Sequence, residues 1–257
     1  MLDELVKESQ MLVEASVNQK SEETILCSLS KLHGSNKHGH GYTKLYNYIF
    51  KNSQDNSLNI LEIGIGTLIP NAPSTMNLDP NSPPATKPGG SLRMWKDFFR
   101  YSNIFGIDIA DDCMFTEERI KTFKANQAKP NELIDFAKSL DLKFDIIIDD
   151  GVHLLGPTYI TLVTLLDFLQ PGGIYIIEDI WQEYREAWLD LLQHLSMAWP
   201  EAKEKYSTAW VDLRNMTKPV MKAKISSCFI SMMKKFIRSS FKFNAPKFTM
   251  STLLLNY

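Results

Sequence analysis

Residues 144–153, FDIIIDDGVH, constrain the fold more than any other stretch of this chain. Residues 146–148 are three consecutive isoleucines without polar alternation, a pattern typical of a strand buried on both faces of a parallel sheet. Such a strand cannot carry two adjacent aspartates inward, so Asp149 and Asp150 must lie just past its carboxyl end. Ligands bind at that edge in open parallel sheets. From these residues alone, a polar turn that merely caps the next helix stays an open alternative.

The rest of the chain alternates strand and helix patterns. Further strands are predicted where short apolar runs recur, at residues 58–63, 104–109, 123–127 and 174–177. Helices are predicted at residues 91–99, 131–140 and 157–169, with a helical turn at 117–120 and a Pro-Gly-Gly turn at 171–173. This alternation predicts an α/β fold with a doubly wound, mostly parallel sheet.

The core is predicted at residues 51–215, preceded by a helical extension over residues 1–50 and followed by a basic C-terminal extension over residues 216–257. The proline-rich insert 67–90 is expected to be a surface loop or lid beside the ligand crevice. The last extension has eight Lys or Arg residues and no Asp or Glu. It is either a terminal α/β extension that covers the sheet, or a surface for anionic lipid or an acidic partner.

Composition excludes several classes of protein. The net charge of −2 gives no overall basic field for nucleic acid. The three cysteines, Cys27, Cys113 and Cys228, are widely spaced, which indicates neither a disulfide framework nor a zinc site and favours a reducing compartment. The acidic N-terminus does not read as a signal peptide, and no apolar run reaches the roughly 18 residues that span a bilayer. We therefore expect a cytoplasmic protein.

A glycine turn follows the first predicted strand. Gly64 and Gly66 come directly after Glu62 and allow the backbone to turn tightly and approach a ligand closely. The third small residue of a dinucleotide fingerprint is replaced by Ile69, which disfavours a nicotinamide site. An acidic residue before Gly-x-Gly is instead typical of S-adenosylmethionine sites. Asp108, at the end of the second strand, can accept hydrogen bonds from ribose hydroxyls.

Carboxylates gather where three neighbouring strands end: Glu62, Asp149, Asp150, Glu178 and Asp179. Such groups repel one another unless a positive charge lies among them. A hard dication with oxygen ligands meets this need, and magnesium fits best, with calcium and manganese open. The predicted ligands are Asp150, Glu178 and Asp179. Alternatively, Glu178 and Asp179 only stabilise a helix N-terminus.

His153 follows Asp150 by three residues, so a helical turn there would place both side chains on one side. Because the unperturbed pKa of histidine is about 6.5, His153 can act as a general base beside a metal-bound hydroxyl, although a structural histidine is the alternative. The upstream segment 33–42 is glycine- and histidine-rich. It is either a flexible loop before a helix at 42–50, or a loop that closes over a ligand with Tyr42 or a histidine reaching in.

Several motifs together resemble the macrocin/mycinamicin-type sugar O-methyltransferases, with cephalosporin-hydroxylase-like and rhamnosyl O-methyltransferases as related groups. The motifs are LEIGIG at 61–66, GSLRMW at 90–95, GIDI at 106–109, IDDGVH at 148–153 and PGGIYIIED at 171–179. Segments 34–37 and 41–46 also look like the part of the family before the first strand. The resemblance covers roughly residues 32–185.

The resemblance implies a metal-dependent class I methyltransferase that uses S-adenosylmethionine and Mg²⁺ to methylate a sugar hydroxyl. It implies that His153 is the base and that Asp150 and Asp179 hold magnesium. It also implies that Glu62, Gly64, Ser91, Arg93 and Asp108 contact the cofactor. We predict further cofactor contacts at Gly66, Asn126, Gln127 and Asp149. The family often has Gly-Asp-Gln where this chain has Ala125-Asn126-Gln127, which predicts an altered adenine-side contact.

Other functions remain compatible with the sequence. The acceptor could be a catechol-like or lipid-linked molecule, since a catechol also presents paired oxygens to magnesium. A non-catalytic protein of the same fold could instead dock to a membrane or partner through its basic C-terminus. We expect a small-molecule or glycoside substrate, no nucleic acid, no transmembrane segment and a homo-oligomer.

Overall fold

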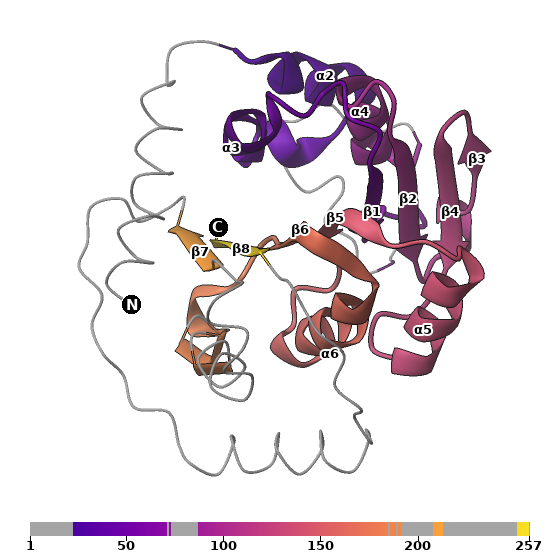
Figure 1. The fold of residues 1–257 in the computed structure, drawn as a ribbon, viewed down its shortest axis with the longest axis vertical. Helices are drawn as coiled ribbons and strands as arrows, with labels where there is room; N and C mark the ends of the chain where they lie inside the picture. The colour runs from indigo at the N-terminus through magenta and orange to yellow at the C-terminus, as the bar shows by residue number, and fades with distance from the viewer. Residues whose placement is uncertain are drawn as a thin grey trace.

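The computed structural model describes residues 23–70, 72, 87–184, 186–188, 190–191, 208–212 and 251–256. A central sheet lies between two layers of helices (Figure 1). The first layer contains α2 (Ile25–His33), α3 (Tyr42–Phe50) and α4 (Gly90–Phe98). The second contains α5 (Pro130–Ser139) and α6 (Leu155–Leu165). None of the helices in these ranges is long and apolar enough to cross a membrane.

The sheet has eight strands in the order β3-β4-β2-β1-β5-β6-β8-β7. Their bounds are Asn59–Ile63 (β1), Asn103–Asp108 (β2), Thr116–Glu117 (β3), Ile120–Lys124 (β4), Phe144–Asp149 (β5), Leu169–Ile177 (β6), Thr208–Asp212 (β7) and Ser251–Asn256 (β8). Only β3 pairs antiparallel, so the predicted doubly wound, mostly parallel sheet is confirmed. The strand order reverses between β1 and β5, and open α/β sheets bind ligands beyond the carboxyl ends of the strands at such a point.

Three local predictions differ from the structure. The helical turn predicted at 117–120 is the turn of a β3–β4 hairpin, in which Arg119 has a φ of 59°. The turn predicted at 171–173 lies inside β6, where a register shift against β5 accommodates the glycines. The helix predicted at 157–169 begins at Leu155 and ends at Leu165, followed by a 3₁₀ turn. Pairing of the flanking residues Leu169 and Ile174 with β5 keeps the Pro-Gly-Gly segment within one strand.

The helical extension predicted for residues 1–50 is, over its described part, integral to the core. Leu26, Tyr42 and Tyr46 share one buried cluster with Trp95 of α4. Residues 1–22 and 73–86, the latter within the predicted insert, lie outside the described residues. Of the basic C-terminal segment, the structure describes residues 251–256, which form β8 beside β6.

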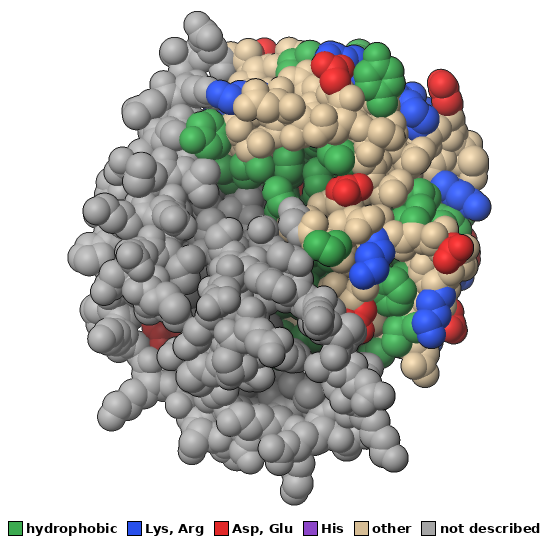
Figure 2. Space-filling model, viewed as in Figure 1, with side chains coloured by type: hydrophobic (Ala, Val, Ile, Leu, Met, Phe, Trp, Pro, Cys, Tyr) green, Lys and Arg blue, Asp and Glu red, His purple; other side chains and the backbone are tan. Residues whose placement is uncertain are grey.

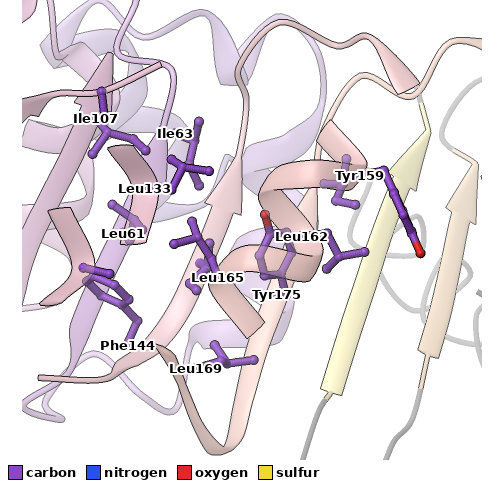
Figure 3. Packing of buried hydrophobic residues seen from close by; sticks show 14 of the residues in the cluster. Leu61, Ile63, Ile107, Leu133, Phe144, Tyr159, Leu162, Leu165, Leu169 and Tyr175 are labelled. Carbon is purple, nitrogen blue, oxygen red and sulfur yellow. The ribbon is translucent and has the colours of Figure 1, made fainter. Parts of the chain in front are cut away.

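The pleat of the sheet decides which face each strand residue meets. Ile60 and Ile148 belong to the cluster under α2–α4, whereas Leu61 and Tyr175 belong to the cluster under α5 and α6 (Figure 3). Because successive side chains point to opposite faces, the acidic residues at the strand ends divide in the same way. Glu62 and Glu178 continue toward the α2–α4 layer, and Asp149 continues toward α6.

Acidic and basic side chains are interspersed on the described part of the face that Figure 2 shows. A single-sign field, which would steer a charged macromolecule, is not visible among them.

Candidate active site

Lys37 lies at the centre of the carboxylates that end β1, β5 and β6. Its ammonium Nζ is 2.6 Å from Asp150 Oδ2, 2.8 Å from both oxygens of Glu178 and 3.1 Å from Glu62 Oε1. The lysine side chain is only 2% exposed. It arrives from the 3₁₀ turn Asn36–His38 between α2 and α3. The positive charge that these carboxylates require is thus supplied, on this side, by the chain itself.

Two tyrosines of α3 complete this layer. Tyr42 donates its hydroxyl to Asp179 Oδ1 over 2.8 Å and accepts the backbone N–H of Asp179 over 3.0 Å. One turn later, Tyr46 donates to Glu178 Oε1. Burial raises the pKa of both tyrosines well above the ordinary value, so both remain donors. Tyr42, at the end of segment 33–42, thus reaches the acidic residues from the start of the helix α3, while closure of this segment over a ligand stays a prediction.

Asp150, His153 and Asp179 form a separate cluster beside Lys37. One ligand atom from each lies within 4.8 Å of the others, and among the described residues this is the one group suited to a metal ion. His153 Nε2 is 3.1 Å from Asp150 Oδ1 and 3.9 Å from Asp179 Oδ2. Both His153 (φ 57°) and Asp179 (φ 49°) adopt the left-handed backbone region. Non-glycine residues held there concentrate at functional sites, because the fold must hold them against strain.

Charges within the cluster shift its pKa values. Burial disfavours ionisation of Asp150, but Lys37 and His153 outweigh it and lower the pKa of this carboxyl to about 2. Burial likewise disfavours the imidazolium of His153, yet the hydrogen bond and charge of Asp150 raise its pKa to about 9. The ammonium of Lys37 is buried too, but the surrounding carboxylates raise its pKa well above the ordinary value. His153 is therefore an ion-pair partner of Asp150 unless another cation takes up that charge.

The glycine turn after β1 lies against the same loop. Gly64 and Gly66 have φ values of 87° and 85°, which only glycine adopts freely. A Cβ on Gly64 would lie 2.1 Å from the backbone oxygen of Asp150. Asp108 holds this turn by accepting the N–H of Ile65 over 2.8 Å and the N–H of Gly66 over 3.3 Å. The predicted cofactor turn and the acidic cluster therefore meet at Asp150.

Two of the predicted cofactor residues, Glu62 and Arg93, bind partners within the chain. Glu62 is fully buried, and its carboxylate accepts the indole N–H of Trp95 over 3.1 Å. Burial raises the pKa of Glu62, while hydrogen bonds from Lys37 and Ser91 oppose this rise. Arg93 binds Glu117 with Nε and Nη2, the latter over 2.7 Å, and its Nη1 donates to the carbonyl of Pro88. Both side chains tie α4 to its surroundings, and their contact with a cofactor stays a prediction.

The segment after β4 also has a structural role. Gln127 donates to Asp149 Oδ1 over 3.0 Å and to Thr161 over 3.0 Å, and it accepts the N–H of Val152 over 2.7 Å. Asp149 is 1% exposed, and burial raises its pKa to about 7. Its carboxylate therefore faces α6, where the pleat directs it, and not the crevice. Asn126 uses its side-chain oxygen to accept the N–H of Ala128.

Glu178, one of the three predicted metal ligands, has partners within the chain. Its two oxygens are bound by Lys37 and Tyr46, and it lies outside the cluster in which His153 takes a place beside Asp150 and Asp179. Sequence reasoning missed Lys37 and Tyr46. The surplus of carboxylates indicated that a cation was needed, but no local pattern shows that a lysine more than 20 residues before the first strand is buried among them.

Comparisons with known proteins follow the same part of the chain. No protein-family profile matches the sequence. The chain is 38% identical over 160 residues to the 8-demethyl-8-alpha-L-rhamnosyl tetracenomycin-C 2'-O-methyltransferase of Streptomyces olivaceus, which covers 62% of this chain and 38% of the relative. It is 34% identical over 161 residues to the mycinamicin VI 2''-O-methyltransferase of Micromonospora griseorubida. This match covers 62% of this chain and 37% of the relative. The chain thus spans less than half the length of the curated relatives it matches.

Solved structures agree. The MycE methyltransferase of the mycinamycin pathway, in complex with Mg and SAH, is 31% identical and superimposes with a TM-score of 0.55 over 69% of this chain and 49% of that one. A complex of MycE with Mg, SAH and mycinamycin VI gives a TM-score of 0.56 at 29% identity, over 71% of this chain and 47% of that one. The chain has the class I methyltransferase fold. The predicted resemblance of this part of the chain to the macrocin/mycinamicin-type sugar O-methyltransferases is confirmed.

Proposed function

We propose that this protein is an S-adenosylmethionine- and Mg²⁺-dependent O-methyltransferase that acts on a sugar hydroxyl of a glycosylated small molecule. One observation carries the proposal. The backbone oxygen of Asp150 lies against the Gly64 turn, while the side chain of the same residue belongs to the cluster with His153 and Asp179. A cofactor at the glycine turn and an acceptor at the cluster would therefore be neighbours, as methyl transfer requires.

The residues present fit both groups. Asp150 and Asp179 offer the carboxylate oxygens that a hard divalent cation prefers, and the His153 imidazole beside them stays available as the base. The turn that contains Gly64 and Gly66 follows β1 at the ligand edge of the sheet, and Asp108 lies beside it at the end of β2. Glu178 belongs to the proposed site as well, held beside the cluster by Lys37 and Tyr46.

When bound, S-adenosylmethionine supplies an electrophilic methyl group, and the divalent cation supplies positive charge that lowers the pKa of a nearby hydroxyl. The remaining steps belong to the chain. Asp150 and Asp179 form the acceptor side of the proposed site. Tyr42 holds Asp179 in place, because its hydroxyl donates to the Asp179 carboxylate and accepts the backbone N–H of Asp179. His153 Nε2 takes the proton of the reacting hydroxyl once the charge of Asp150 is balanced elsewhere. The contact between His153 Nε2 and Asp150 Oδ1, over 3.1 Å, sets the position of the imidazole.

Relatives support a sugar acceptor. Their names specify hydroxyls of rhamnosyl, mycinamicin and macrocin compounds, and MycE has been solved with mycinamycin VI. A sugar with two neighbouring hydroxyls and a catechol both present paired oxygens, so the cluster alone does not distinguish them. The proposal for a glycoside, rather than a catechol, therefore depends on these relatives.

The test is a methyl-transfer assay on a panel of acceptors with and without EDTA. We expect transfer to rhamnosides or other deoxysugar glycosides, loss of transfer with EDTA, and recovery with added Mg²⁺. Calorimetry should show binding of S-adenosylhomocysteine. Transfer only to catechols would show that the acceptor is a catechol and not a sugar. Absence of S-adenosylhomocysteine binding would refute the enzymatic proposal in favour of a binding protein.

A further inference from the structure

Lys37 forms ion pairs with carboxylates from three adjacent strands, and its ammonium donates hydrogen bonds to Asp150 and to both oxygens of Glu178. The partners are Glu62 at the end of β1, Asp150 just past β5 and Glu178 just past β6. On Asp150 the lysine takes Oδ2 alone, at 2.6 Å. The other oxygen, Oδ1, lies 3.1 Å from His153 Nε2. The lysine thus divides the carboxylate of Asp150 into an oxygen that faces inward and one that faces the cluster.

The backbone that carries Lys37 is fixed independently of these ion pairs. Ser30 Oγ donates to the carbonyl of Ser35 over 2.8 Å and accepts the N–H of His38 over 3.2 Å. Ser35 Oγ caps the short 3₁₀ turn by accepting the N–H of Lys37 over 3.4 Å. Ser30, Ser35 and Lys37 are all buried. The ammonium is therefore delivered from a rigid support, as preorganisation of a site requires.

We propose that Lys37 is a positioning residue of the reaction. By holding Asp150 Oδ2 and the whole Glu178 carboxylate, it turns Asp150 Oδ1 toward His153 and Asp179 and so sets the geometry of the divalent-cation site. This inference rests on the proposed function. It assigns a role to the segment before the first strand, which touches the site through Lys37 and Tyr42.

A purely charge-balancing lysine and a positioning lysine predict opposite signs for metal affinity. An ammonium beside the cluster repels a dication, so removing it without moving Asp150 would tighten metal binding. If Lys37 instead orients Asp150, its removal lets the carboxylate turn away, and metal binding weakens. The sign of the change therefore separates the two roles.

The experiment compares Glu178→Gln with the double variant Lys37→Met/Glu178→Gln, in the full chain. The pair differs by Lys37 alone, and the double variant keeps the summed charge of the wild-type pair, because it removes one positive and one negative group. Binding of Mn²⁺ is measured by electron paramagnetic resonance of the free ion, without cofactor or acceptor. Binding of S-adenosylhomocysteine is measured by calorimetry, and Lys138→Met, at an exposed position near the end of α5, controls for loss of a lysine.

We expect the double variant to bind Mn²⁺ about tenfold more weakly than Glu178→Gln, with S-adenosylhomocysteine affinity within about twofold; the tenfold change corresponds to about 1.4 kcal/mol. Mn²⁺ binding that is equal or tighter overturns the inference and leaves the proposed function intact. If the wild type binds neither Mn²⁺ nor S-adenosylhomocysteine, both fail.

Should the double variant not fold, Lys37→Arg replaces it. Arginine keeps the charge but moves the donors, since a guanidinium is larger and planar. Positioning predicts weaker Mn²⁺ binding and a lower kcat for this variant, while charge balance predicts wild-type values. Wild-type values for both would overturn the inference.

Discussion

Replacing Gly64 with alanine tests how closely the glycine turn approaches the acidic loop. At a φ of 87°, a non-glycine residue costs about 1–2 kcal/mol, offset by about 0.4–1 kcal/mol because alanine restricts the unfolded chain. The new Cβ would also lie 2.1 Å from the Asp150 oxygen, where ordinary contact begins at 3.4 Å, so that oxygen must move by about 1.3 Å. Crowding of this kind costs about 1–3 kcal/mol more.

Gly41 provides the matched control. Its φ is 82°, close to that of Gly64, but a Cβ there meets nothing within 4 Å. Gly41→Ala should therefore lower the free energy of unfolding by only about 1 kcal/mol, through backbone strain alone. We expect Gly64→Ala to be about 2 kcal/mol less stable than Gly41→Ala, a Tm difference of about 4–8 °C for a domain of this size.

Urea unfolding and thermal scans measure both variants, and calorimetry follows S-adenosylhomocysteine. Because the displaced Asp150 backbone joins the cofactor turn to the cluster, Gly64→Ala should also lose affinity for S-adenosylhomocysteine, whereas Gly41→Ala should not. Equal stability of the two variants, within about 0.5 kcal/mol, would refute the close approach at Gly64 on which the adjacency of the two sites depends.

Three further substitutions test the assigned roles. His153→Ala should lower kcat by roughly 10²-fold or more with nearly unchanged S-adenosylhomocysteine affinity, and unchanged turnover would remove it from the mechanism. Gln127→Ala leaves buried Asp149 without its amide donor, so the free energy of unfolding should fall by about 1–3 kcal/mol in urea titration; a neutral result would contradict the structural role. Arg93→Lys loses the paired bond to Glu117 and should lower stability, with S-adenosylhomocysteine affinity within about twofold. A large loss of that affinity would restore Arg93 as a cofactor contact.

Much of the site could be predicted because strand ends are local features of the sequence. The run of isoleucines that ends at Asp149 and Asp150 marks a buried strand, and the carboxyl end of such a strand lies at the ligand edge. Gly64 and Asp108 are placed by the same argument. His153 follows within three residues, and the structure brings it to Asp150 and Asp179.

The pleat of the sheet and the helices that cover its two faces decided the direction in which each carboxylate points. Asp149 points toward α6, where Gln127 and Tyr175 bind it, whereas Glu62 and Glu178 point toward Lys37. The alternation could have been counted from the sequence. The identity of the partner on each face could not, because Lys37 and Gln127 come from segments distant in the chain.

The sequence by itself determined the strand–helix alternation, the glycine turn and a surplus of negative charge at one edge of the sheet. Those features depend on residues within a few positions of one another. Only the tertiary structure decided how that charge is balanced, because burial of Lys37 among three strand ends requires α2, α3 and the sheet to be assembled first. A buried ammonium is stable only when its carboxylate partners are already in place.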